Sequence, residues 1–200
     1  MPVIDERRSI EAARRGDLAA FNSLVLEHQA LVYNLCLRML GSPAAAEDAA
    51  QEAFLAAWRK LAQLRGESFR PWLLRIAVNA CRDELRRRGR RPAASLEVSI
   101  DEGMAEPADP AALPEAATLT GELRGQIEAA LLVLPEDQRA AVILCDVQGF
   151  DYQQIAQIMG SSLGTVKSRI SRGRMRLREL LLAAPELLPA SYRPSKEESE

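Results

Sequence analysis

The chain has 200 residues, of which 48% are hydrophobic and 27% are charged, and its formal net charge is −2. This is ordinary globular composition and provides enough apolar residues for a core. No apolar run approaches the roughly 20 residues that a membrane-spanning helix needs. The N-terminal residues include acids and lack the apolar stretch of a secretory signal. These features exclude membrane insertion and favour a cytoplasmic protein. Because the net charge is close to zero, any nucleic-acid surface must come from how the charges are distributed.

The three cysteines are far apart, and each lies within an apolar helical pattern (Cys36, Cys81 and Cys145). Their odd number and the lack of a CxxC pair argue against a disulfide framework or a zinc site. We predict buried free thiols in a reducing cytosol.

Residues 1–91 show apolar residues at helical spacing and no useful stretch of period-two alternation. One predicted helix ends at Gly41, after which Ser42 and Pro43 supply the N-cap and the first-turn proline of the next helix. A third helix begins near residues 68–71 and runs into an arginine cluster. We predict that residues 1–91 form a small helical domain.

From residue 92 to residue 122 the chain carries seven acids, four prolines and no Lys or Arg. Proline removes backbone donors and uncompensated like charge resists collapse, so residues 92–117 are predicted to be a flexible acidic linker. Residues 118–183 are predicted to form a second helical domain, and residues 184–200 a disordered tail. The expected fold class is all-α, with two small helical domains joined by the linker.

Acidic and amide residues occupy the exposed side of the second predicted helix. A metal-binding carboxylate helix is one interpretation, but helical-bundle metal sites use Glu-x-x-His pairs. The only histidine, His28, lies outside such a motif and is predicted to pack in the core. We therefore predict no metal and no other cofactor, and a face for docking another protein remains open. The residues on this side are Glu47, Asp48, Gln51, Glu52 and Arg59.

The third predicted helix carries a basic stripe. Arg75, Asn79, Arg82 and Arg86 follow at i, i+4, i+7 and i+11, so they share one face. Arginine donates to phosphate, and an amide can pair with a base edge. The alternative is a solvated helix face. Further arginines at the end of the helix favour a phosphate-binding surface (Arg87, Arg88, Arg90 and Arg91).

The predicted second domain, residues 118–183, has the pattern of a helix-turn-helix. Asp151 and Gln154 form a capping box at the start of a short helix that ends at Gly160. Ser162 then caps a second helix that begins at Leu163. Two capped helices joined by so short a turn are typical of this motif.

In the second of these helices, a rotation of 100° per residue places apolar and polar residues on opposite faces. Small polar residues on its outer face could enter a major groove, with flanking cations on the phosphates. A solvated amphipathic helix is the alternative, but six basic residues against one acid favour DNA binding. The inner face carries Val166, Ile170, Gly173, Leu177 and Leu180, and the outer face carries Ser168, Ser171, Arg172 and Met175.

Several motifs together resemble one family. In chain order they are GDLAAFNSLVLEHQALVYNL, AEDAAQEAFLAAWRKL, FRPWLLRIAVNACRDELRRRGRR, LPEDQRAAVILCDVQGFDYQQIAQIMG and LGTVKSRISRGRMRLREL. They cover about residues 10 to 183 in the order and spacing of extracytoplasmic-function (group IV) sigma factors of the sigma-70 family. The resemblance implies a promoter-recognition subunit of RNA polymerase without catalytic residues of its own.

The resemblance also implies partners and residue roles. The partners are core RNA polymerase (the clamp helices of its largest subunit and the flap of the second largest), promoter DNA and an anti-sigma factor. Asp48, Gln51 and Glu52 would dock on the clamp helices. In the −10 element, Leu64, Ile76 and Asn79 would form the pocket for a flipped base, and Arg75, Arg82 and Arg86 would hold the strand backbone. In the −35 element, Lys167, Ser168, Ser171 and Arg172 would read bases, and Thr165, Arg169 and Arg174 would contact phosphates.

Two other classes of protein compete with this interpretation. A free-standing dimeric repressor or activator could use the same helix-turn-helix. Such a protein would need a dimerising or ligand-binding domain, but residues 1–91 carry a basic stripe where a sensor pocket would be expected. A nucleic-acid enzyme would need a catalytic motif, and the sequence has no P-loop, GxSxG, zinc-ligand cluster or Cys/His pairing. Binding of promoter DNA only together with core polymerase would separate a sigma factor from the repressor.

Overall fold

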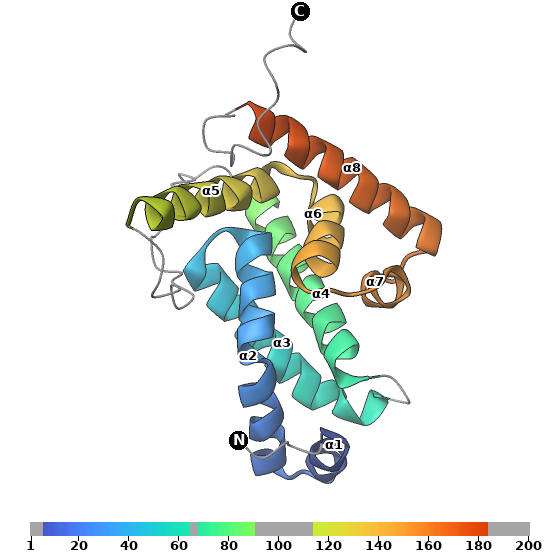
Figure 1. Cartoon of the computed structure of the whole chain (residues 1–200). Helices are drawn as coiled ribbons and strands as arrows, with labels where there is room; N and C mark the ends of the chain where they lie inside the picture. Colours follow the sequence, from blue (N-terminus) through green and yellow to red (C-terminus); the bar gives the residue numbers. More distant parts are fainter. Residues whose placement is uncertain (1–5, 65–67, 91–113, 184–200) are drawn as a thin grey trace, which may run out of the picture.

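A computed structural model describes residues 6–64, 68–90 and 114–183 (Figure 1). Residues 92–113 of the predicted linker and the predicted tail lie outside the described residues. The described part is helical and holds no strand, which confirms the all-α class. No helix in this part is long and apolar enough to cross a membrane. The α-helices are α1 (Glu6–Arg14), α2 (Leu18–Leu40), α3 (Pro43–Lys60), α4 (Phe69–Arg90), α5 (Pro114–Val133), α6 (Glu136–Val142), α7 (Tyr152–Met159) and α8 (Leu163–Leu182).

Helices α1 to α4 form an N-terminal group in which α2, α3 and α4 pack against one another (Figure 1). Helix α1 lies across the start of α2. The apolar positions at helical spacing point inward, and His28 is buried with them, as predicted. Two of the cysteines also lie in this core, while the third is half-buried, and all three are free thiols. A hydrogen bond with Cys36, together with burial, raises the pKa of Cys81.

The end of α2 follows the predicted capping pattern. Gly41 adopts φ 69°, a left-handed conformation that favours glycine, and its N–H donates to the carbonyl of Leu37. Ser42 then caps α3 through a 3.5 Å hydrogen bond from the backbone N–H of Ala45. A Cβ added at Gly41 would lie 2.5 Å from Leu132 Cδ1 of α5. Glycine therefore both ends α2 and allows α5 to approach it.

Helices α5 to α8 form a C-terminal group, in which α8 packs against α5, α6 and α7. Helix α5 begins at Pro114, so its first residues lie inside the range predicted as linker, and the rest of it lies inside the predicted second helical domain. The chain stays helical after α6 but changes its hydrogen-bond pattern. It continues after α6 as a π-helical turn, η2 (Ile143–Val147), closed by a 3.0 Å bond from the Gln148 N–H to the Ile143 carbonyl. Such turns insert one extra residue into a helix.

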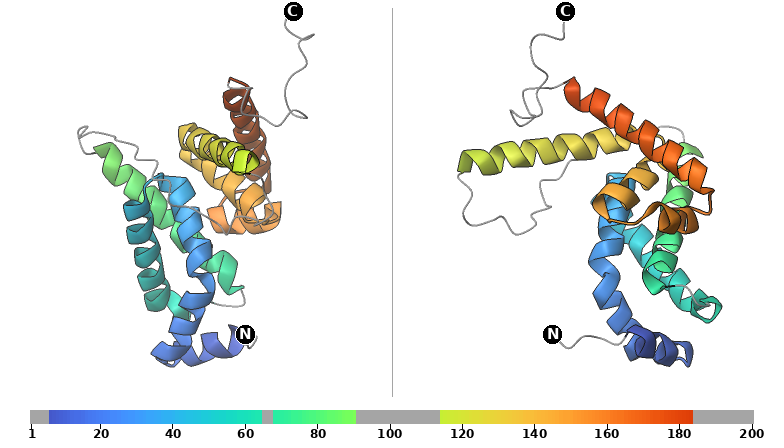
Figure 2. Two further views of the ribbon diagram at one scale, coloured as in Figure 1. Left: turned by 60° about the vertical axis from the view of Figure 1, so that its left-hand side comes forward. Right: turned by 45° about the vertical axis from the view of Figure 1, so that its right-hand side comes forward.

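The two groups pack against each other. Helix α7 lies against α4, and α5 and α6 contact α2, as two views of the molecule agree (Figures 1 and 2). The predicted DNA-contacting helices α4 and α8 thus belong to different groups but to one packed body.

Candidate nucleic-acid and polymerase interfaces

The helix-turn-helix has the capping predicted from the sequence. The Gln154 N–H donates to Asp151 Oδ1 at 2.8 Å, and the Asp151 N–H donates to the Gln154 side-chain oxygen at 3.1 Å. Gly160 ends α7 with φ 60°, and the Thr165 N–H donates to Ser162 Oγ at 3.2 Å. These local bonds fix where α7 ends and where α8 begins, and so which residues of α8 face outward.

The buried and exposed residues of α8 lie on opposite faces of the helix, largely as predicted. Val166, Ile170 and Gly173 are buried. A Cβ added at Gly173 would lie 2.7 Å from Val142 Cγ2 and 3.4 Å from the Gln138 carbonyl oxygen, so glycine allows α6 and α8 to meet closely. The buried stripe weakens toward the C-terminus of the helix, where Leu177 is half-buried and Leu180 is exposed. On the opposite face, Ser171, Arg172 and Met175 are exposed, as expected for a groove-facing surface.

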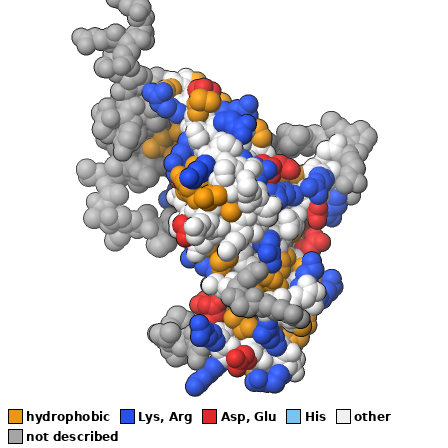
Figure 3. All heavy atoms as spheres, turned by 90° about the vertical axis from the view of Figure 1, so that its right-hand side faces the viewer, with side chains coloured by type: hydrophobic (Ala, Val, Ile, Leu, Met, Phe, Trp, Pro, Cys, Tyr) orange, Lys and Arg blue, Asp and Glu red, His pale blue; other side chains and the backbone are white. Residues whose placement is uncertain are grey.

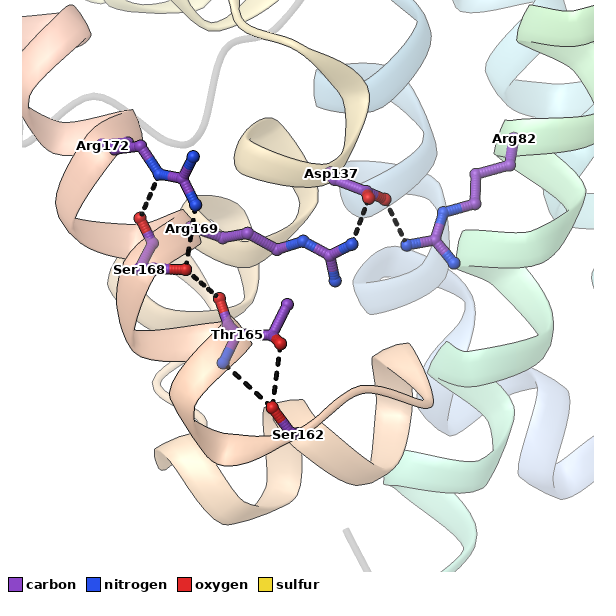
Figure 4. Close-up of polar contacts among 7 residues, drawn as sticks. All are labelled: Arg82, Asp137, Ser162, Thr165, Ser168, Arg169 and Arg172. Carbon is purple, nitrogen blue, oxygen red and sulfur yellow. Dashed lines mark hydrogen bonds and ion pairs between the residues drawn. The ribbon is translucent and has the colours of Figure 1, made fainter.

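A chain of hydrogen bonds runs along α8 from its N-cap to the outer face (Figure 4). The hydroxyls of Ser162 and Thr165 are 2.8 Å apart. Ser168 Oγ donates to the Thr165 carbonyl at 2.9 Å and accepts from Arg172 Nη2 at 3.0 Å. Arg172 Nε also donates to the Ser168 carbonyl at 3.2 Å. The Arg172 guanidinium is therefore held beside the outer face of the helix.

Two arginines predicted to contact phosphates are paired with carboxylates within the C-terminal group. Arg169 Nη2 forms an ion pair with Asp137 Oδ2 (Figure 4). Arg174 pairs with Asp146, with Nε 3.0 Å from Oδ2, and this hydrogen bond raises the pKa of Arg174. Lys167, by contrast, is exposed near the start of α8.

The residues predicted for the −10 element do not share one exposed surface. Leu64 lies in the hydrophobic core, Ile76 packs against that core, and Asn79 is exposed on α4. Arg75 is half-buried.

The two remaining arginines of the basic stripe are both paired with carboxylates. Exposed Arg86 bonds to Asp83 at 3.1 Å. Arg82 has only 13% of its side chain exposed, and its Nη2 lies 2.7 Å from Asp137 Oδ1 in the other helical group.

The predicted docking face of α3 is open. Asp48, Gln51 and Glu52 are all exposed, and Glu52 lies 3.7 Å from Arg87, which is also exposed. Leu55 is 49% exposed and shares this face, because it follows Gln51 by four residues and Glu52 by three. Leu55 was not predicted as part of this face, although helical spacing alone indicates it.

Arg139 is a buried cation that was not predicted from the sequence. Its guanidinium donates to the Leu134 carbonyl at 2.9 Å and to the carbonyls of Leu132 and Met39. Burial lowers the pKa of Arg139. Because Met39 is in α2, this side chain ties the last turn of α2 to the end of α5. No local pattern indicates such a contact, since 100 positions separate Arg139 from Met39.

The face that carries α7 and the beginning of α8 is rich in cations. Figure 3 shows Lys and Arg side chains from one end of this face to the other, with acidic side chains in smaller patches between them. Within the described ranges, no cluster of three His, Cys, Asp or Glu side chains could hold a metal ion. The site therefore offers cationic donors, hydroxyls and an amide, which are the groups that contact nucleic acids.

Comparison with known proteins identifies both groups. Sigma-70 region 2 matches residues 24–91, and Sigma-70 region 4 matches residues 124–177. The RNA polymerase sigma-H factor of Pseudomonas aeruginosa is 38% identical over 174 residues, which cover 84% of this chain and 90% of that protein. The chain belongs to the ECF group of the sigma-70 family. The ECF RNA polymerase sigma-E factor of Escherichia coli K12 is 40% identical over 169 residues, covering 82% of this chain and 88% of its own.

A solved structure supports the fold of this sigma factor. The sigma factor RpoE of Bartonella quintana, in complex with the anti-sigma factor NepR, is 30% identical with a TM-score of 0.62. The match covers 80% of this chain and 96% of that one. As a member of this family, the chain is a specificity subunit for transcription and not an enzyme, and its family binds RNA polymerase and promoter DNA.

Proposed function

We propose that this sigma factor directs core RNA polymerase to promoters by reading the −35 duplex with α8 and opening the −10 element with α4. The observation that carries the proposal is the geometry of α8. A buried stripe anchors one side of the helix, and the opposite side presents Ser171, Arg172 and Met175 to solvent after a fully capped turn. A helix held in this way can enter the major groove with its outer residues on base edges.

In the −35 element, we assign base contacts to Lys167, Ser168, Ser171 and Arg172. Arginine commonly bonds guanine in a bidentate manner, whereas small hydroxyls accept or donate to several bases. The hydrogen bonds from Arg172 to Ser168 support this assignment, because they hold the guanidinium along the outer face. The backbone contacts would come from Thr165, Arg169 and Arg174.

In the −10 element, we assign strand contacts to Arg75, Arg82 and Arg86 and base capture to Asn79 with Leu64 and Ile76. Flipping a base costs a few kcal/mol, which apolar contact and one amide bond to the base edge can offset. Exposed Asn79 supports this role. Leu64 is buried, so its contribution requires a local rearrangement when the DNA strand binds.

We assign polymerase docking to α3, with Asp48, Gln51 and Glu52 on the clamp helices of the largest subunit, and we assign the C-terminal group to the flap of the second largest. The exposed acidic and amide face supports the first contact. Because the relative from Bartonella quintana was solved with an anti-sigma factor, we propose that a protein of that class controls this chain too. Polymerase binding would place the chain in the cytoplasm.

The proposal is tested by transcription in vitro with purified core polymerase and genomic DNA, followed by sequencing of the transcript starts. We expect starts at a distinct set of promoters with a common −35 and −10 sequence only when the chain is added. The docking variant Asp48→Lys with Glu52→Lys should abolish these starts. Starts that do not change on adding the chain would contradict the proposal.

A further inference from the structure

Exposed cations gather around α1, at the lower end of the molecule in Figure 1. Arg7, Glu11 and Arg14 follow at i, i+4 and i+7, so they share one face of the helix, while Ala13 on another side is buried. The exposed acids at this end are Glu11 and Asp17, and Asp17 is the N-cap of α2. The exposed cations, which we call the α1 patch, are Arg7, Arg8, Arg14, Arg15 and Lys60.

A hydrogen bond joins the two parts of the α1 patch. Arg14 Nε donates to the Leu61 carbonyl at 3.3 Å. Leu61 opens the short 3-10 helix η1 (Leu61–Gln63), which directly follows Lys60 and contacts α1. The end of α1 is therefore held against the end of α3, and the cations of both helices are brought together. Figure 3 shows Lys and Arg side chains grouped at this lower end, with fewer acidic side chains between them.

The cations of the α1 patch differ in their pairing from the arginines of α4 and α8. Three arginines of α4 and α8 are bonded to Asp137 or Asp146. Among the residues that the structure describes, the side chains of Arg7, Arg15 and Lys60 have no ion-pair partner. An anionic ligand can therefore bind the α1 patch without first displacing a carboxylate of the protein.

The position of the α1 patch favours DNA as this ligand. Helix η1 ends directly before Leu64, which we assign to base capture in the −10 element. The strand on one side of the captured base would then run over the neighbouring α1. The patch offers only flexible cations, which neutralise phosphates and carry no donor and acceptor pattern for a base edge.

We propose that the α1 patch binds the phosphate backbone of the DNA strand next to the −10 element and adds affinity that does not depend on sequence. The inference rests on the proposed role of the N-terminal group in the −10 element. It assigns a binding surface to α1, which lies before the residues matched by Sigma-70 region 2. Because each neutralised phosphate releases counterions, the salt dependence of binding reports the contact.

The test uses holoenzyme with the full chain and a promoter fragment chosen from the mapped transcript starts, with a mismatched −10 region that leaves the strand open. Arg7→Gln with Arg15→Gln removes two charges of the α1 patch. Arg7→Lys with Arg15→Lys is the matched control, because it keeps both charges at the same positions. Glu11→Gln removes the acid that shares the face with Arg7, so it should act in the opposite direction.

We expect the Gln pair to bind the fragment about fivefold to thirtyfold more weakly than the wild type. The slope of log K against log salt should flatten by about 1.4 units, since each single-strand phosphate contact contributes about 0.7. The Lys pair should stay within about twofold of the wild type, and Glu11→Gln should bind about twofold more tightly. Uncharged methylphosphonates next to the −10 element should weaken the wild type and leave the Gln pair almost unchanged.

An unchanged salt slope in the Gln pair would overturn the proposal, as would equal losses in the Gln and Lys pairs or equal effects of methylphosphonates on the wild type and the Gln pair. Weaker retention of the Gln pair on immobilised core polymerase without DNA would also overturn it, because the α1 patch would then bind an acidic surface of the polymerase. Transcript starts that do not depend on the wild-type chain would remove the proposed function and the α1 contact together. Starts that depend on the chain, with an unchanged salt slope in the Gln pair, would remove the α1 contact alone.

Discussion

The polar face of α3 and the basic faces of α4 and α8 differ in how their charges are used. On α3, Asp48 and Gln51 are exposed, and the contact of Glu52 with Arg87 is 3.7 Å between two exposed side chains. On α4 and α8, Arg82, Arg169 and Arg174 are each bonded to a carboxylate. The side chains proposed for polymerase docking are thus exposed, whereas three arginines proposed to contact DNA are paired with Asp137 or Asp146. A charged side chain on a predicted binding face can therefore already be paired within the protein.

The largest effect is expected at the open face. Asp48→Lys together with Glu52→Lys should abolish binding to core polymerase, because both side chains are exposed and their reversal changes the charge of the docking surface. Helical content by circular dichroism should be unchanged. Glu11→Lys with Glu27→Lys is the control, since it makes the same charge change at exposed positions of α1 and α2. Equal retention of both double variants on immobilised core polymerase would refute the docking assignment.

On α8, two arginines about 200° apart on the helix should give different profiles. Arg172→Ala should cost about 1–3 kcal/mol on the cognate −35 sequence and relax base preference there. Arg174→Ala should weaken binding on all sequences alike and flatten the salt slope by about one unit. A salt titration of each mutant holoenzyme on matched and mismatched promoters separates the two. Identical profiles would mean that the groove-facing side of α8 has been assigned wrongly.

Two glycines of α8 sharpen the comparison between its buried and exposed faces. Gly173→Ala should destabilise the chain by about 1–2 kcal/mol, because its Cβ would meet Val142 Cγ2 at 2.7 Å in a packed core. Gly164→Ala meets only Ser162 Oγ at 3.9 Å and should be neutral or stabilising by up to about 1 kcal/mol. Urea denaturation measures both free energies of unfolding. If the two substitutions have the same effect, α6 and α8 do not pack as closely as described.

The smallest effect is expected from His28. Burial lowers the pKa of His28 below 6.5, so the unfolded chain binds a proton more readily than the folded chain. Stability should therefore fall as the pH drops below about 6.5, by about 1.4 kcal/mol for each unit of pKa depression. His28→Gln should show a shallower pH dependence of the free energy of unfolding between about pH 5 and 7. Parallel curves for the wild type and the variant would show that burial of the imidazole does not contribute.

Sequence patterns predicted best those features that local interactions determine. The left-handed end of α2 at Gly41, the capping box of Asp151 with Gln154 and the N-cap Ser162 follow from residues within one helical turn of each other. The all-α class and the buried His28 followed from helical periodicity. The family resemblance depended on motifs that span most of the chain, and the comparisons confirm it.

Features that depend on distant contacts were not predictable. The first residues of α5 were assigned to the linker because they continue a stretch of acids and prolines, and nothing in the apolar spacing indicates the π-helical turn η2. Asp137 and Arg82 are 55 positions apart, so nothing local indicates that they form a bond. Leu64 was expected near a base pocket, yet the packing of the N-terminal group places it in the core. Its role in binding the −10 strand, like the roles of the other assigned residues, stays a prediction.

The most direct test of sequence reading by α8 uses a promoter library with a randomised −35 region, transcribed by holoenzyme carrying the wild-type chain or Arg172→Ala. The wild type should enrich a defined −35 sequence among the transcribed promoters. The variant should lose preference at one or two adjacent positions and keep it elsewhere. A wild type that enriches no sequence, or a variant whose preference weakens equally at every position, would contradict base reading by this helix.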